Sequence, residues 1–346
     1  MKVEIKNRFS DDLLREAIDR YGISPDKVKL LGDFDSFVYE FERSGQNGIL
    51  RISHSSKRSA SLVRGELDWI GHLVQGGAAV SAATPSESGE LLEELDDEHG
   101  ETFLVAAFRR AEGVSPKSGE WTREITEQYG ELLGRIHRLS RNYSPTNPAW
   151  LRLAWNDPVM LDVEETLSGV DGSGLDGSGL DGPRLDGRVL EQFTRLLTIL
   201  EKLPKDKASY GLIHQDAHGE NLKIDEAGRI TLFDVFDCAY SWFVNDIAIV
   251  LFYAAMWEED RSVFTQEFMR HFLEGYRRES ELEASWLTAM PAFLKLREID
   301  LYAVIRREFG SDWQDDGWNA GYMHGRKERI EAGLPYIDYD FSKLAD

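Results

Sequence analysis

The sequence contains a single cysteine, Cys238, so it can form neither an intramolecular disulfide bond nor a cysteine-rich metal site. It also lacks a long apolar run, because the longest, 247–257, is about half of what a bilayer-spanning helix needs. Its first residues, MKVEIK, have no apolar core of the kind found in a secretory signal peptide. These absences predict a soluble protein of the cytoplasm with no membrane partner.

Basic residues are scarce beside acidic ones, with 40 Lys and Arg against 62 Asp and Glu and a formal net charge of −22. Such a chain repels phosphate backbones, which argues against nucleic acid as a partner. Hydrophobic residues still make up 42% of the 346 positions, which is enough for a substantial core and excludes wholesale disorder. At roughly 150 residues per domain, the length predicts two domains or lobes. The oligomeric state is not readable from the chain.

The first third of the chain has the pattern of a small sheet with one key helix. Strands are expected at 37–42 and 49–52, on either side of a turn at 44–48, and at 103–108 after a polar stretch. Helices are expected at 10–21 and 61–74. From residue 120 onward, amphipathic patterns predict mostly helices, including 189–203, with a strand pair near 222–236.

One segment, 170–189, is of low complexity. It repeats a five-residue unit of the form LDGSG, with Gly and Asp in nearly every copy. Its aspartates invite a calcium-binding interpretation, but the nine-residue spacing of calcium-binding β-rolls is missing. A flexible surface insertion without chemistry is therefore expected.

The stretch 211–237 carries the strongest chemical pattern. It places His214, Asp216 and Asn221 in a loop, followed by a predicted hairpin that brings Asp234 back beside Asn221. Phosphoryl transfer needs one carboxylate that accepts a hydroxyl proton, and an amide oxygen and a second carboxylate that hold magnesium against the phosphates. The spacing HxDxxxxN, with an Asp thirteen residues after the Asn, supplies this set.

The motif resembles that of the aminoglycoside phosphotransferase and choline kinase superfamily, which has the protein-kinase-like fold. The resemblance implies an ATP- and Mg²⁺-dependent kinase with a bilobal α+β fold. It also implies a nucleotide-binding lobe at 1–108 and a helical catalytic and substrate lobe at 109–346. Its residue roles are as follows: Asp216 is the catalytic base, Asn221 and Asp234 are the magnesium ligands, His214 holds the loop, Asp237 is a further acidic position, and Asp246 is a buried structural brace.

The same resemblance places the nucleotide among residues of the first lobe. Arg51 stands on the predicted third strand where a cation contacts the α- and β-phosphates, and Glu66 on the next helix would hold it. Arg replaces the usual Lys and keeps the charge. The turn 31–39 has one glycine instead of three, and Ser36 with nearby N–H groups would meet the phosphates. Adenine would bond to backbone near Ala107, Phe108 and Arg109.

Other interpretations of these residues stay open. His214 and His218, four apart with Glu220 nearby, are a possible zinc pair, but the helix and third ligand expected of such a site are missing. A non-catalytic nucleotide-binding pseudokinase is a further alternative, although no catalytic residue is replaced.

We expect the acceptor to be a hydroxyl of a small molecule, such as an aminoglycoside, choline or another amino alcohol, homoserine or a sugar. A protein hydroxyl is the alternative. Tryptophans beside carboxylates at 257–260 and 312–318 could bind an ammonium group. We favour instead a solvated acidic face with core-packed tryptophans.

Overall fold

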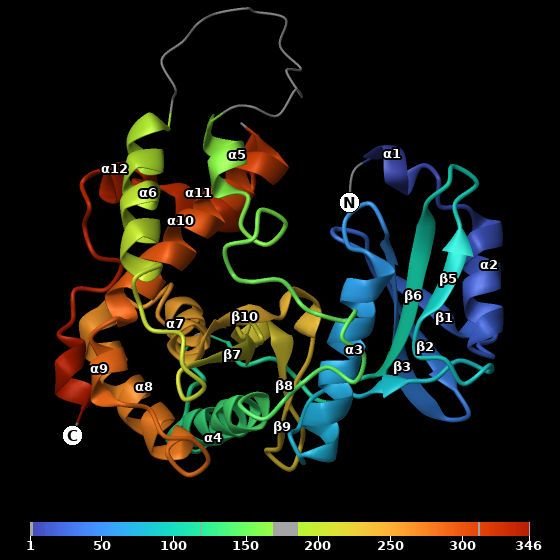
Figure 1. Ribbon diagram of the computed structural model, residues 1–346, viewed down its shortest axis with the longest axis horizontal. Helices are drawn as coiled ribbons and strands as arrows, with labels where there is room; N and C mark the ends of the chain where they lie inside the picture. Colours follow the sequence, from blue (N-terminus) through green and yellow to red (C-terminus); the bar gives the residue numbers. More distant parts are fainter. Residues whose placement is uncertain (1–2, 118, 169–185, 311, 346) are drawn as a thin grey trace, which may run out of the picture.

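The computed structural model describes residues 3–117, 119–168, 186–310 and 312–345, and shows a β-sheet part beside a larger helical part (Figure 1). The elements of the first part are α1 (Val3–Lys6), α2 (Asp11–Arg20), η1 (Pro25–Lys27), β1 (Val28–Gly32), β2 (Phe37–Arg43), β3 (Gln46–His54), α3 (Ala60–Gln75), β4 (Ala83–Thr84), β5 (Glu93–Asp96) and β6 (Thr102–Arg109).

The elements of the second part begin with α4 (Arg123–Ser140), α5 (Val163–Ser168), α6 (Gly187–Leu200), β7 (Tyr210–Ile213), η2 (Gly219–Asn221), β8 (Leu222–Ile224), β9 (Ile230–Leu232), η3 (Val235–Asp237) and β10 (Ala239–Trp242). They continue with α7 (Phe243–Ala254), α8 (Arg261–Tyr276), α9 (Ala284–Leu287), α10 (Met290–Phe309), η4 (Asp312–Asp315), α11 (Gly317–Met323), α12 (Arg326–Glu331) and η5 (Phe341–Leu344). Among the residues described, no helix is long and apolar enough to cross a membrane.

The sheet is antiparallel, with the order β1-β2-β3-β6-β4 and with β5 also paired to β6. Alternate residues of β6 point to opposite faces, as the period of two in a strand requires. Phe103, Val105 and Ala107 enter a core shared with α2, while Leu104 and Ala106 enter the main core that continues into the helical part. The sheet is therefore packed on both faces, and α3 lies between it and the helices (Figure 1).

In the helical part, α4 and α8 pack closely because glycines face the partner backbone. A Cβ atom on Gly275 would lie 1.9 Å from the carbonyl oxygen of Glu127, and one on Gly130 would lie 1.9 Å from that of Phe272. Neither approach is possible for a larger residue without moving a helix.

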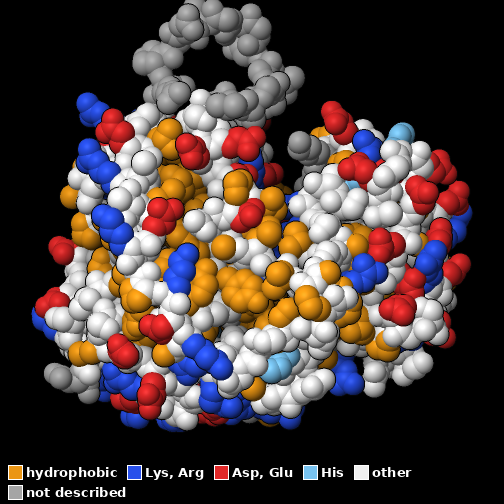
Figure 2. Space-filling model, in the orientation of Figure 1, with side chains coloured by type: hydrophobic (Ala, Val, Ile, Leu, Met, Phe, Trp, Pro, Cys, Tyr) orange, Lys and Arg blue, Asp and Glu red, His pale blue; other side chains and the backbone are white. Residues whose placement is uncertain are grey.

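In Figure 2, hydrophobic side chains gather on the face in view over α7 and β10, between the sheet and the outer helices.

The predicted α+β, bilobal architecture is confirmed, and so are the helix at 61–74 and the strand pair near 222–236, seen as α3, β8 and β9. The turn at 44–48 is shorter than expected, because Ser44 and Gly45 have φ of 54° and 75° and β3 already starts at Gln46. The polar stretch before β6 contains an unpredicted strand, β5, whose exposed and buried side chains alternate.

The predicted insertion 170–189 lies mostly outside the described residues, and its C-terminal end was placed too late. Asp186 is buried and accepts a hydrogen bond of 2.7 Å from the hydroxyl of Tyr302, and α6 begins at Gly187. Four residues that read as repeat therefore belong to the folded helical part.

The favoured interpretation of the tryptophans was wrong for two of them. Trp257 is 48% exposed and Trp318 is 43% exposed, and their rings meet edge to face with centroids 6.0 Å apart. Trp313, by contrast, is partly buried and packs against the main core. An exposed pair of indole rings therefore lies where the C-terminal end of α7 meets α11.

Candidate active site

The segment 211–237 folds as a strand, a loop and a hairpin that brings three polar side chains together. Strand β7 leads into the loop with Asp216, and Asn221 ends η2 immediately before β8. Strands β8 and β9 pair with Leu222 opposite Leu232, and the N–H of Phe233 donates to the carbonyl of Asn221 at 2.9 Å. The predicted hairpin is present, and it carries Asp234 back beside Asn221.

A buried carboxylate holds the loop that carries Asp216. Asp246, in the first turn of α7, accepts the backbone N–H groups of His214 and Gln215, both at 2.8 Å, and its side chain is fully buried. His137 of α4 contacts the same carboxylate at 3.2 Å, and the His214 ring bonds to the carbonyl of Phe233 at 2.9 Å. These contacts fix the loop against α4, α7 and the end of β9.

Gln215 has a φ of 70°, a left-handed conformation that costs a side-chain-bearing residue about 1–3 kcal/mol and glycine almost nothing. The two bonds to Asp246 come from the N–H of Gln215 and from that of the preceding residue, and they keep the strained residue in place. The side chain of Gln215 accepts a hydrogen bond of 3.2 Å from Asn245.

The carboxylate of Asp216 is engaged at both oxygens. Oδ1 accepts a bond of 2.5 Å from Nη2 of Arg297, while Oδ2 accepts one of 3.0 Å from Nδ2 of Asn221 and lies 3.2 Å from Nε2 of His218. Burial acts to raise the pKa of Asp216, but His218 and Arg297 more than offset this and hold the pKa well below its usual range. Asp216 is therefore a carboxylate at neutral pH.

Arg51 and Glu66 form a buried ion pair with two hydrogen bonds, of 2.8 and 2.7 Å, from the two ends of the guanidinium to the two carboxylate oxygens. Their side chains are 8% and 0% exposed. The guanidinium also lies over the ring of Phe236, 4.3 Å from its centroid, and 4.0 Å from Oδ1 of Asp234. This pair links β3 and α3 of the sheet part to the hairpin of the helical part.

Asp234 itself has a left-handed backbone, with φ of 59°, and opens the short helix η3. Although 55% of its side-chain surface is exposed, the protein around it restricts water, and this raises the pKa of Asp234. Arg51 opposes the shift, whereas the nearby carboxylates of Asp237 and Asp216 add to it. Asp237 forms its own ion pair with the buried guanidinium of Arg58.

Two of the predicted nucleotide contacts, Ala107 and Phe108, lie within the sheet. At these residues β6 pairs with both β3 and β4. The ring of Phe108 also contacts the Arg51 guanidinium, at 4.9 Å. Adenine bonding to the backbone near these residues stays a prediction.

Ser36 ends the turn between β1 and β2 and is 5% exposed. Within the described part of the chain, it makes no hydrogen bond to any other predicted site residue. An ion pair between Asp35 and Lys57 ties this turn to the segment that follows β3. The turn thus lies next to the Arg51 strand, but its role toward phosphate stays a prediction.

Sequence reasoning missed the residues that approach Asp216 from α7 and α10. Arg297 of α10 donates to Asp216, to the hydroxyl of Tyr253 at 2.7 Å and to Asp300 at 2.9 Å. Tyr253 also packs against the ring of His218, with centroids 4.8 Å apart. No motif surrounds Arg297, so only its helical spacing of three from Asp300 could have drawn attention to the pair.

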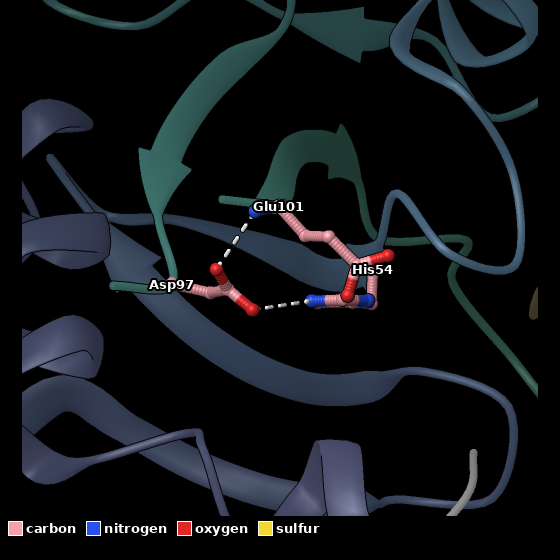
Figure 3. Close-up of side chains that lie close together, drawn as sticks. All are labelled: His54, Asp97 and Glu101. Atoms are coloured by element: carbon pink, nitrogen blue, oxygen red, sulfur yellow. Dashed lines mark hydrogen bonds and ion pairs between the residues drawn. The ribbon is translucent and has the colours of Figure 1, made fainter. Parts of the chain in front are cut away.

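The contacts in the structure argue against the metal-binding alternatives. Both ring nitrogens of His214 are used, because Nε2 bonds to the carbonyl of Phe233 at 2.9 Å and Nδ1 accepts the N–H of Asp216 at 3.3 Å, which leaves neither for zinc. Elsewhere in the described residues, His54, Asp97 and Glu101 lie within metal-binding distance of one another (Figure 3). Arg8 already donates to Asp97 and Glu101, both at 2.9 Å, so a side-chain cation neutralises that cluster.

A carboxylate, an amide and a second carboxylate that converge beside a buried Arg–Glu pair are the arrangement of a kinase for small-molecule hydroxyls. The chain matches the model of the phosphotransferase enzyme family over residues 28–282, and it belongs to that family.

Relatives of known name agree with this assignment. The chain is 35% identical over 347 residues to the amicoumacin kinase of Bacillus subtilis (strain 168), covering 99% of this chain and 98% of that protein. A solved amicoumacin kinase in complex with AMP-PNP, Ca²⁺ and Ami superposes with a TM-score of 0.89 at 31% identity, over 99% of this chain and 100% of that one. The microcompartment-associated aminopropanol kinase, at 21% identity, shares the fold, with a TM-score of 0.73 over 95% of this chain and 100% of that one.

Proposed function

We propose that the protein transfers the γ-phosphate of ATP, with Mg²⁺, to a hydroxyl of a small molecule, and that amicoumacin or a close analogue is the acceptor. The observation that carries the proposal is the convergence of Asp216, Asn221 and Asp234 from one loop and hairpin next to the buried Arg51–Glu66 pair. The choice of acceptor rests on the 35% identity, over nearly the whole chain, to an amicoumacin kinase. The nucleotide would bind between residues 1–108 and 109–346.

Asp216 acts in this proposal as the base. Its Oδ1 accepts the hydroxyl proton while the hydroxyl oxygen bonds to the γ-phosphorus and the bond to the β-phosphate oxygen breaks. Asn221 and His218, both on Oδ2, keep the carboxylate oriented. Because its pKa is held low, Asp216 is ionised and ready to accept a proton across the physiological range.

The residues present fit a divalent metal ion. Nδ2 of Asn221 is used in bonds to Asp216, which leaves Oδ1 as the metal-binding atom, and Asp234 offers an exposed carboxylate beside it. Burial is the main reason that the pKa of Asp234 is raised, and the nearby carboxylates of Asp237 and Asp216 add to it, so a cation bound here would lower that pKa. When bound, Mg²⁺ would neutralise charge on the phosphate oxygens.

Arg51 would contact the α- and β-phosphates. Glu66 and the two phenyl rings fix its guanidinium, so its position is set before the nucleotide arrives. Lying 4.0 Å from Asp234, it is within reach of the same phosphate groups that the metal would hold.

The test is incubation of the purified protein with ATP, Mg²⁺ and single acceptors, followed by mass spectrometry of the acceptor. The panel contains amicoumacin, spectinomycin, choline, 1-amino-2-propanol, homoserine and a Ser/Thr peptide mixture. Phosphorylated amicoumacin is the expected product, and its absence with Asp216→Asn would assign the base. Phosphorylation of another compound would replace the proposed acceptor, and no product from any acceptor together with no ATP binding would overturn the proposal.

A further inference from the structure

The oxygen of Asp216 that must meet the acceptor is already occupied. A carboxylate accepts about four hydrogen bonds, two at each oxygen. Oδ2 is used by Asn221 and His218, so an incoming hydroxyl is left with Oδ1. Nη2 of Arg297 holds Oδ1 at 2.5 Å, which is the short distance of a charge-assisted bond. The guanidinium therefore occupies one of the two acceptor positions of Oδ1, and its positive charge makes this oxygen a weaker base.

Arg297 has a second set of partners that does not involve Asp216. Its Nη1 donates to Asp300, one helical turn away on α10, at 2.9 Å, and Nη2 also donates to the hydroxyl of Tyr253 at 2.7 Å. Separating a buried guanidinium from its only partner is costly, but Arg297 would keep Asp300 and Tyr253. Breaking the bond to Asp216 therefore costs less free energy for Arg297 than it would for an arginine with one partner.

The space beside Arg297 is polar and small. A cavity of about 10 Å³, which is space for one water molecule, lies against Arg297, with Gln215, Asn245 and Asp300 among the polar residues that line it. Nε of Arg297 is buried and has no hydrogen-bond partner in the described structure, which is unusual for a buried donor. A water molecule in this cavity would supply an acceptor to the guanidinium after it leaves Asp216.

We propose that Arg297 is a positioning residue that restrains Asp216 until an acceptor enters, and that it then gives up its bond to Asp216 while it keeps those to Asp300 and Tyr253. The inference rests on the proposed role of Asp216 as the base. It predicts a specific consequence for water, which is always present near the γ-phosphate. With Arg297 in place, the remaining acceptor position of Asp216 belongs to an oxygen paired with a cation, so proton transfer from water is disfavoured and ATP is hydrolysed slowly in the absence of the acceptor.

Removal of Arg297 should therefore speed the hydrolysis of ATP by water. Water would then lose a proton to Oδ1 of Asp216 while its oxygen bonds to the γ-phosphorus and the bond to ADP breaks, giving ADP and inorganic phosphate. A positioned general base contributes about 10²–10⁴-fold to such a step. We expect acceptor-independent ATP hydrolysis to rise at least about tenfold in Arg297→Met, whereas a residue with only a structural role would lower hydrolysis and transfer together.

The experiment measures phosphate release from ATP and Mg²⁺ without acceptor, and kcat and KM with acceptor, for the wild type, Arg297→Met, Arg297→Lys and Tyr253→Phe. Arg138→Met is the matched control, because Arg138 is exposed on α4 and pairs with Glu279 at 2.8 Å. Hydrolysis should rise most in Arg297→Met, less in Arg297→Lys, which keeps the charge, and not in the control. Hydrolysis without acceptor should rise less in Tyr253→Phe than in Arg297→Met, because the hydroxyl lost there holds Arg297 at 2.7 Å while the guanidinium stays on Asp216.

Two further outcomes decide the matter. The rise in hydrolysis should disappear in the double variant Asp216→Asn/Arg297→Met, and persistence of the rise there would overturn the proposal. Unchanged or lowered hydrolysis in both Arg297 variants, with urea midpoints near the wild-type value, would overturn it too. Failure of the proposed function looks different, because the wild type would then show no ATP-induced stabilisation and no transfer to any acceptor.

Discussion

Glu66→Gln removes the carboxylate that neutralises the buried guanidinium of Arg51. Glu66 is fully buried and Arg51 is only 8% exposed, so solvent cannot replace the lost charge. Breaking a buried ion pair from one side costs about 3–5 kcal/mol. Asp234 at 4.0 Å and the ring of Phe236 at 4.3 Å compensate in part, which places the expected loss of unfolding free energy near the lower end, at about 3 kcal/mol.

The double variant Arg51→Met/Glu66→Leu distinguishes the contribution of the ion pair to the free energy of unfolding from its role in nucleotide binding. Replacing a whole buried ion pair by apolar residues of similar size is often neutral. The Nε of Arg51 is also buried without a partner, so removal of this arginine relieves a further cost. We expect the double variant to recover to within about 1 kcal/mol of the wild type, while it loses nucleotide binding.

The assay is urea unfolding followed by tryptophan fluorescence, with and without ATP and Mg²⁺. At an ATP concentration about 100 times its Kd, the wild type should gain about 2.7 kcal/mol, and the double variant should gain nothing. A loss below about 1 kcal/mol in Glu66→Gln, or a double variant as unstable as the single one, would refute the argument that the pair is buried and mutually dependent. ATP-induced stabilisation of the double variant would refute the proposed phosphate contact.

Three further predictions concern single residues. Burial raises the pKa of Asp300 to about 6 from 3.8, so the folded state binds this proton more tightly than the unfolded chain. Relative to Asp300→Asn, the wild type should therefore lose about 3 kcal/mol of unfolding free energy between about pH 4 and about pH 7, and a flat difference would contradict the assigned burial. Gly275→Ala should destabilise the protein by more than about 2 kcal/mol, because the new Cβ would lie 1.9 Å from a carbonyl oxygen of α4. Gly71→Ala, in open space on α3, should stabilise it by about 0.5–1 kcal/mol, and equal urea midpoints for the two variants would show that the close approach is misplaced. Asp246→Asn should lower kcat at least about tenfold with little change in ATP binding, because the loop around Asp216 loses its charged acceptor, and an unchanged kcat would remove that role.

What could be predicted from the sequence is what depends on neighbours along the chain. The hairpin that joins Asn221 to Asp234 is fixed by a turn and two short strands within thirteen residues. The pairing of Arg51 with Glu66 follows from one strand and the next helix. Both groups of residues lie close in sequence, so local patterns and the family resemblance place them well.

The errors concern contacts that no local pattern encodes. Strand β4, which has two residues and no sequence signature, was not expected, and it pairs with β6 at Ala107 and Phe108. Arg297 was missed because it reaches Asp216 from 81 residues further along the chain, on a helix without a motif. The exposure of Trp257 depends on how α7 ends against α11, which is a matter of tertiary packing.

The most direct test of the central claim is phosphoryl transfer to amicoumacin by the wild type and by Asp216→Asn, followed by mass spectrometry under the same ATP and Mg²⁺ conditions. The account predicts phosphorylated acceptor from the wild type and almost none from Asp216→Asn, although both proteins are stabilised by ATP. Equal product from the two proteins would contradict the assignment of Asp216 as the base, and with it the proposed mechanism.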